Sequence, residues 1–164
     1  MSQKYNENQF QIVTNSPEQT VKLGASIGSA LKGGEILALT GPLGSGKTHL
    51  IKGIAHAARA TDQNSVNSPT FVIVNEYHRP DGSLDIYHID AYRITSIAEF
   101  ERLGFDDLCY PNSVVLVEWA DKVEPVLKNL DVIQVKLSHV GPQQRKIKIK
   151  NLPPHICLKT GLPS

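Results

Sequence analysis

The chain has few of the features that mark membrane, disulfide-rich or nucleic-acid-coating proteins. No apolar run approaches the roughly 20 residues of a membrane-spanning helix. The polar residues 1–8 lack the apolar core of a signal peptide, and the formal net charge is only +1. Two cysteines, Cys109 and Cys157, form neither a metal-ligand spacing nor a disulfide framework. We therefore expect two reduced thiols in a cytoplasmic protein that is not a polycation.

Length and composition predict one globular domain. The 164 residues are 40% hydrophobic and 20% charged, which is ordinary for a soluble domain with its own core. We place this domain at residues 1–152. The segment 153–164 is rich in proline, and we expect it to form a poorly ordered C-terminal tail.

The segment Gly41–Thr48 reads GPLGSGKT and satisfies G-x-x-x-x-G-K-[ST], the phosphate-binding P-loop. Its glycines allow the backbone N–H groups to turn towards phosphate oxygens. Lys47 would reach the phosphates, and the Thr48 hydroxyl would bind Mg²⁺. An apolar run at 36–39 and a helical pattern from residue 49 flank the motif, which an incidental glycine-rich turn would lack. We assign the nucleotide site to Gly41, Gly44, Ser45, Gly46, Lys47, Thr48 and His49.

The remaining pattern predicts strands and helices around this loop. Ser16 followed by Pro17 predicts the start of a helix that ends at Gly33–Gly34, and Ser96 with Glu99 predicts a short helix that ends at Gly104. The turn signal at 79–82 predicts an antiparallel hairpin. Strands are expected at 10–14, 36–39, 71–74, 84–89, 114–117, 132–137 and 145–150.

Two acidic residues follow expected strands at the edge where parallel α/β sheets bind ligands. Asp90 follows the strand at 84–89, and Glu118 follows the strand at 114–117. A P-loop protein needs a carboxylate to complete the Mg²⁺ shell or to hold its waters. We therefore assign Asp90 and Glu118, with Lys47, as catalytic residues, and Asp90 and Glu118, with Thr48, as metal ligands. Either acid alone could instead be a solvated residue after a strand.

Three nearby residues have two readings each. His88 could be a general base, although a strand histidine is more often packed and hydrogen-bonded. Arg93 could reach a phosphate or pair with a carboxylate. Trp119, the only tryptophan, could pack in the core or anchor a surface beside the site.

The strand expected at 145–150 alternates lysine with isoleucine, so it has one basic and one apolar face. We interpret Lys146, Lys148 and Lys150 as protection of an edge strand. A patch for nucleic acid or for a partner is the alternative.

Taken together, the motifs resemble the TsaE (formerly YjeE) family, bacterial ATPases of the tRNA threonylcarbamoyladenosine pathway. The similarity covers about residues 10–150 and includes the P-loop followed in order by Ser68–Phe71, His88–Arg93, Leu103–Phe105 and Val117–Ala120. The resemblance implies an α/β fold: a single-domain P-loop NTPase with a mostly parallel central sheet, added antiparallel strands and a three-layer α/β/α-like arrangement.

The resemblance also implies a function. Family members hydrolyse ATP weakly, with ATP/ADP and Mg²⁺ as ligands, and they support a complex of TsaD and TsaB that modifies adenosine 37 of tRNAs reading ANN codons. The tRNA would be contacted only indirectly through that complex, and the chain would be a monomer without membrane contact. The family's switch-like Ser-Pro-Thr loop maps onto Ser68, Pro69 and Thr70, which adds Ser68 and Thr70 to the nucleotide site.

Two positions depart from the family's pattern. Pro42 stands where an acidic residue is common, and His49 stands where threonine is common. Neither change removes a phosphate or metal ligand, but both could alter adenine contacts, hydrolysis rate or the partner surface.

Two other function classes compete with this reading. A small-metabolite kinase usually carries a lid with clustered arginines, and the five arginines here are scattered. A GTP-binding switch would need an Asn-Lys-x-Asp stretch that reads guanine, and the sequence has none.

Overall fold

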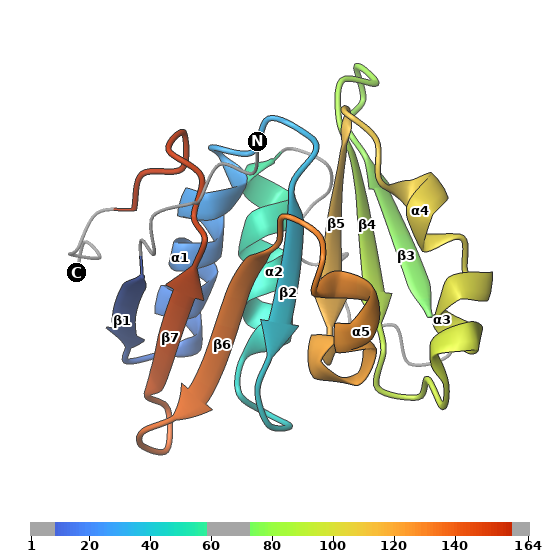
Figure 1. The fold of residues 1–164 in the computed structure, drawn as a ribbon. Helices are drawn as coiled ribbons and strands as arrows, with labels where there is room; N and C mark the ends of the chain where they lie inside the picture. Colours follow the sequence, from blue (N-terminus) through green and yellow to red (C-terminus); the bar gives the residue numbers. More distant parts are fainter. Residues whose placement is uncertain (1–8, 59–72, 159–164) are drawn as a thin grey trace.

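The computed structural model describes residues 9–58 and 73–158, which form one mixed sheet with the strand order β1-β7-β6-β2-β5-β4-β3 (Figure 1). The centre is parallel: β2 pairs with β5 and β6, and β5 also pairs with β4. Antiparallel strands β7, β1 and β3 extend the two sides. The strands are β1 (Phe10–Thr14), β2 (Ile36–Thr40), β3 (Val74–His78), β4 (Asp85–Asp90), β5 (Ser113–Glu118), β6 (Ile133–His139) and β7 (Arg145–Lys150).

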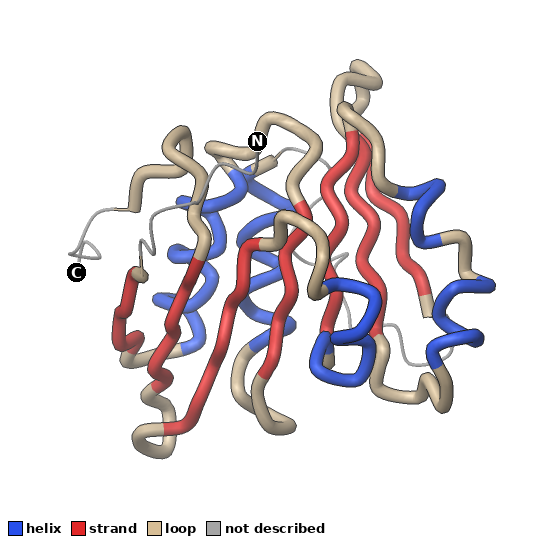
Figure 2. The backbone as a smooth tube through the Cα atoms, in the orientation of Figure 1, coloured by secondary structure: helices blue, strands red, loops and turns tan. Residues whose placement is uncertain are grey.

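Helices cover both faces of the sheet, so the expected three-layer α/β/α arrangement is confirmed (Figure 2). The apolar side chains accordingly form two clusters, one on each side of the sheet. The far face in Figure 1 carries α1 (Pro17–Gly28) and α2 (Lys47–Ala57). The other face carries short helices: α3 (Ile97–Arg102), α4 (Phe105–Leu108), the 3₁₀ helix η2 (Ala120–Val123) and α5 (Glu124–Leu127).

Helices α1 and α2 approach each other so closely that their backbones touch. A Cβ on Gly24 would lie 2.1 Å from the carbonyl oxygen of Leu50, and one on Gly53 would lie 2.0 Å from that of Val21. Both distances are far below van der Waals contact, so these positions accept only glycine without a shift of the helices. This contact fixes α2, and therefore the loop that precedes it, against α1 and the sheet.

Two predicted boundaries are wrong. The first helix ends at Gly28 rather than at Gly33–Gly34, because the chain turns there and the Glu35 carboxylate binds the N–H groups of Lys32 and Gly33 at 2.9 and 2.7 Å. Strand β3 spans Val74–His78, so it continues past the predicted end at residue 74, while residues 71 and 72 lie outside the described residues. It is an edge strand with one solvated face. The sequence pattern that marks it is therefore the alternation VNEYH and not an apolar run.

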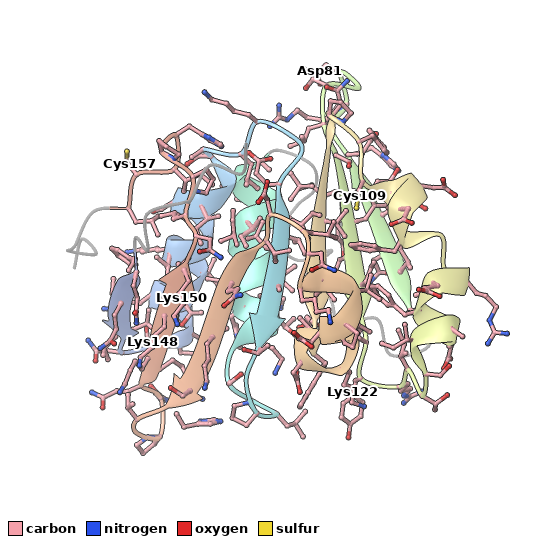
Figure 3. The ribbon with its side chains drawn as sticks, viewed as in Figure 1. Asp81, Cys109, Lys122, Lys148, Lys150 and Cys157 are labelled. Carbon is pink, nitrogen blue, oxygen red and sulfur yellow. The ribbon has the colours of Figure 1, made fainter. Side chains whose placement is uncertain are left out.

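The interpretation of the lysines on β7 as edge protection is also wrong. β7 lies between β1 and β6, so it is an interior strand. Ile147 and Ile149 are buried, whereas Lys148 and Lys150 project from the near face of the sheet, where β6 and β7 carry no helix from the described part of the chain (Figure 3). A groove of about 750 Å³ runs between these lysines and α5.

The segment after β7 begins by packing against the domain. Ile156 is only 3% exposed and joins the cluster under α1 and α2. His155 Nε2 lies 2.9 Å from Glu35 Oε1, which ties residues around 155 to the turn before β2. The boundary at residue 152 stays a prediction.

Candidate functional site

The P-loop connects β2 to α2 at the carboxyl end of the sheet's central strand, as the sequence predicts. Gly41 has φ +146°, and a Cβ there would lie 2.5 Å from the Leu137 carbonyl oxygen. Gly46 has φ +96° and caps α2 in the left-handed region. A side chain would strain the backbone at both positions. The turn of the backbone from β2 into α2 therefore requires glycine there.

Lys47, in the first turn of α2, turns back towards the loop. Its Nζ donates to the carbonyl oxygens of Gly41 and Pro42 at 2.6 and 3.0 Å, and lies 3.4 Å from Ser45 Oγ. The residue is only 6% exposed. Burial lowers the pKa of Lys47, while the nearby carboxylates of Glu118, Asp90 and Asp121 oppose that shift. The loop thus holds a desolvated cation at its mouth.

Asp90 and Glu118 lie opposite each other at the ends of the parallel strands β4 and β5. Glu118 is also register-paired with Leu39 of β2, so it lies beside the strand that leads into the loop, and Asp90 lies one strand further away. Asp90 Oδ1 accepts a hydrogen bond from the Tyr92 N–H at 2.9 Å. Burial raises the pKa of Asp90, the Tyr92 bond lowers it, and the charge of Glu118 raises it further. The structure therefore brings the two predicted acids together near Lys47.

Glu118 is held by a buried histidine. Its Oε2 lies 3.0 Å from His88 Nε2, and the two residues are 2% and 0% exposed. The interpretation of His88 as a packed, hydrogen-bonded residue is correct. Its complete burial and its bond to Glu118 argue against the alternative of a general base.

Trp119 lies beside the site rather than within the core. It adopts φ +57°, a left-handed conformation that is unusual for a bulky residue, and it is half-buried. The Lys47 Nζ lies 4.2 Å from the centre of its ring, and the Tyr92 ring lies 4.9 Å away. Lys122 donates a hydrogen bond to the Tyr92 carbonyl oxygen. It lies at the same end of the molecule as the P-loop (Figure 3).

The other predicted residues fall into three groups. Thr48 and His49 follow Lys47 in the first turn of α2, and burial lowers the pKa of His49. Arg93 is exposed and makes no hydrogen bond or ion pair with the described residues. Ser68 and Thr70 lie outside the described residues.

The sequence reasoning missed the β6–β7 hairpin as a support of the loop. Arg145 Nη2 donates to the Gly44 carbonyl at 3.2 Å, and its Nη1 binds carbonyls within the hairpin turn. His139 Nε2 lies 3.4 Å from the Leu43 carbonyl oxygen. These partners are about a hundred positions apart in the chain, so no local spacing reveals them.

The parallel β2–β5 centre, the glycine loop and the strand-end acids define a P-loop α/β domain. The chain belongs to the TsaE family: the family model described as threonylcarbamoyl adenosine biosynthesis protein TsaE matches residues 14–147.

Individual relatives agree with the family model. The tRNA threonylcarbamoyladenosine biosynthesis protein TsaE of Bacillus subtilis is 39% identical over 134 residues, 82% of this chain and 80% of the relative. That of Aquifex aeolicus is 34% identical and covers 85% of this chain and 94% of the relative. The crystal structure of Bacillus subtilis YdiB matches with a TM-score of 0.69 at 28% identity, over 93% of this chain and 92% of YdiB. Within residues 9–58 and 73–158, no helix has the length and apolar character needed to cross a membrane.

Proposed function

We propose that this protein binds ATP with Mg²⁺ at the P-loop, hydrolyses it slowly, and supports a TsaD–TsaB complex that threonylcarbamoylates adenosine 37 of ANN-decoding tRNAs. The observation that carries the proposal is the buried Lys47 ammonium, held at the loop mouth with Asp90 and Glu118 nearby. The pathway comes from the names of relatives such as those of Bacillus subtilis, Aquifex aeolicus and Treponema pallidum, which are tRNA threonylcarbamoyladenosine biosynthesis proteins.

The geometry fits a polyphosphate. Positive φ values at Gly41, Gly44 and Gly46 curl the backbone, and the 11-residue helix α2 starts at the loop with its positive end. Lys47 already has its charge at the loop mouth, where the phosphates would replace the carbonyl oxygens of Gly41 and Pro42 as its partners. Arg145 donates to the Gly44 carbonyl and so links the loop to the β6–β7 hairpin.

The donor set fits Mg²⁺ bound to a nucleotide better than Mg²⁺ bound by protein alone. Among the described residues, no three histidine, cysteine or acidic side chains gather as a metal cage. Asp90, Glu118 and the Thr48 hydroxyl would supply oxygen ligands directly or through water, and phosphate oxygens would supply others. When bound, Mg²⁺ would neutralise charge that develops on the transferred phosphoryl group.

The roles of the chain's own residues follow from their positions. Lys47 would bind and orient the phosphates. Asp90 and Glu118 would hold the metal's waters and orient the attacking water. The Ser68–Thr70 segment would sense the γ-phosphate, which hydrogen exchange over residues 62–71 with ADP and with a non-hydrolysable ATP analogue would test.

A need for partners is consistent with what surrounds the site. The one arginine at the described loop, Arg145, is engaged with backbone carbonyls, and Arg93 is exposed without a partner in the described part of the chain. Neither of these two described arginines is therefore preset to stabilise the transferring phosphoryl group, a contribution typically worth several powers of ten in rate. We accordingly infer slow turnover alone, stimulation by TsaD and TsaB, tRNA contact through that complex, and action in the cytoplasm.

The test is phosphate release from ATP with and without purified TsaD and TsaB. We expect turnover below the usual range of about 1–10³ per second for the isolated chain and a clear increase with both partners. Lys47→Ala should abolish the activity, whereas Lys52→Ala, a matched lysine one turn further along α2, should retain it. Brisk, partner-independent phosphorylation of a small metabolite would instead identify a kinase.

A further inference from the structure

His88 is the one described histidine with no exposed surface, and its only polar contact with another described residue is with the candidate catalytic acid Glu118. We propose that His88 is a positioning residue, whose Nε2–H holds the Glu118 carboxylate in the orientation that the site requires. The role rests on the proposed function, because it assigns His88 a part in the chemistry of Glu118.

The hydrogen-bond partner of His88 places a hydrogen on its Nε2. A carboxylate only accepts hydrogen bonds, so the hydrogen in the 3.0 Å contact with Glu118 Oε2 is on His88 Nε2. Nδ1 is buried without a hydrogen-bond partner among the described residues. Both ring nitrogens are thus buried, and only Nε2 has a hydrogen-bond partner among the described residues, which is Glu118.

Packing alone does not account for a histidine at this position. His88 is register-paired with Leu116 on β5, and Ile86, two residues earlier on the same face of β4, is fully buried. An apolar side chain at 88 would fill this layer without an unpartnered nitrogen, which is costly inside a protein. What such a side chain would remove is the bond to Glu118.

The bond matters because two charged neighbours of Glu118 act on its carboxylate in opposite ways. Asp90 is its register partner on β4 and repels it, while the Lys47 ammonium attracts it from the loop side. The His88 donor holds Oε2 on the side of β4 and so limits the rotation of the carboxylate. Residues that orient an acid beside a metal typically change activity by about 10–100-fold when removed.

The experiment compares His88→Leu, His88→Gln and Ile86→Val. Leucine fills the space without a donor, whereas the glutamine amide nitrogen extends about as far as Nε2 and can donate to Glu118. Ile86→Val is the matched control, because it perturbs the same buried layer without a contact to Glu118. We expect His88→Leu to lower kcat for ATP hydrolysis at least about tenfold with KM changed less than about threefold. His88→Gln should recover most of the loss, and Ile86→Val should keep wild-type kcat.

Two measurements do not depend on turnover. Nitrogen-15 NMR of the ligand-free wild type should show a protonated Nε2 on His88. ADP affinity without Mg²⁺ should be equal in His88→Leu and wild type, because the P-loop is intact, while the gain in affinity on adding Mg²⁺ should shrink in His88→Leu. Should His88→Leu fail to fold, His88→Asn replaces it, since the shorter amide cannot reach Glu118.

The outcomes separate this inference from the function beneath it. If Glu118→Gln impairs hydrolysis but the donor-less His88 variant matches wild type, His88 is only a packed residue and the inference is wrong. The inference also fails if Nε2 carries no hydrogen. If Glu118→Gln itself hydrolyses ATP like wild type, the proposed catalytic role of Glu118 is wrong, and the positioning role of His88 falls with it.

Discussion

The ammonium group of Lys47 lies 4.2 Å from the centre of the Trp119 ring, so the P-loop lysine and the only tryptophan of the chain form a cation–π pair. Such pairs contribute about 0.5–2 kcal/mol, more when desolvated. The fluorescence of Trp119 should therefore depend on the position of Lys47, because any ligand that moves Lys47 changes the surroundings of the indole.

Trp119 fluorescence should therefore report nucleotide binding directly. ADP with Mg²⁺ should change the emission of the wild type saturably, since the phosphates compete for the Lys47 ammonium. Lys47→Ala should alter the emission of the free protein and lose most of the ADP response, whereas Lys52→Ala should behave as wild type. A wild-type-like ADP affinity of Lys47→Ala by calorimetry would contradict the proposed phosphate site.

Removing the charge of either strand-end acid should affect hydrolysis more than binding. Asp90→Asn and Glu118→Gln keep the shape of the side chains but weaken their hold on Mg²⁺, whose charge matters most as phosphoryl transfer proceeds. We expect turnover to fall at least about tenfold with smaller changes in ADP affinity, measured by phosphate release and calorimetry. Unchanged turnover in both variants would mean that the metal ligands lie elsewhere.

Gly53→Ala should destabilise the domain although alanine is the better helix former. The new methyl group would lie 2.0 Å from the Val21 carbonyl oxygen, so α1 and α2 must separate. We expect a net loss of about 2 kcal/mol in the free energy of unfolding by urea, after the gain in helix propensity of about 1 kcal/mol. Ser26→Ala, on the exposed side of α1, should stay within about 0.5 kcal/mol of wild type. Equal stability of Gly53→Ala and wild type would show that the helices have room to adjust.

His78, on the edge strand β3, should titrate above the usual histidine range. The hydrogen bond from its ring to Asp85, 2.6 Å long, is the main cause that raises the pKa of His78, with Glu76 adding to it. Because the folded-state pKa is raised, the interaction stabilises the folded state below the unfolded pKa of about 6.5 and is lost as pH rises through the folded pKa. NMR titration should show the raised pKa in wild type and a return towards 6.5 in Asp85→Asn. An unshifted His78 in wild type would rule out the contact.

The sequence predicts the parts of this structure whose causes are local. The glycines, lysine and flanking apolar run identify the P-loop, and Ser16 and Ser96 cap their helices as expected, each accepting a backbone N–H three residues on. Asp90 and Glu118 could be placed at one sheet edge because parallel strands share a polarity.

The parts that could not be predicted depend on contacts across the fold. The bond from His88 to Glu118 joins β4 to β5, and the bond from Arg145 to Gly44 joins β7 to the loop. Each depends on strand order and register, which one sequence does not reveal. The strand order also places β1 along the outer edge of β7, so the interpretation of the β7 lysines as edge protection was wrong.

Those lysines have a consequence for how copies of the protein meet. Lys136 and Lys148 are register partners, and Lys146 and Lys150 extend the same positive face, with no ion pair to any described residue. A bare sheet face is a surface on which a second sheet could stack, but here each copy presents like charge to the other. Front-to-front stacking is therefore electrostatically opposed, and the opposition weakens as added salt shortens the screening length from about 10 Å at 0.1 M towards about 3 Å at 1 M.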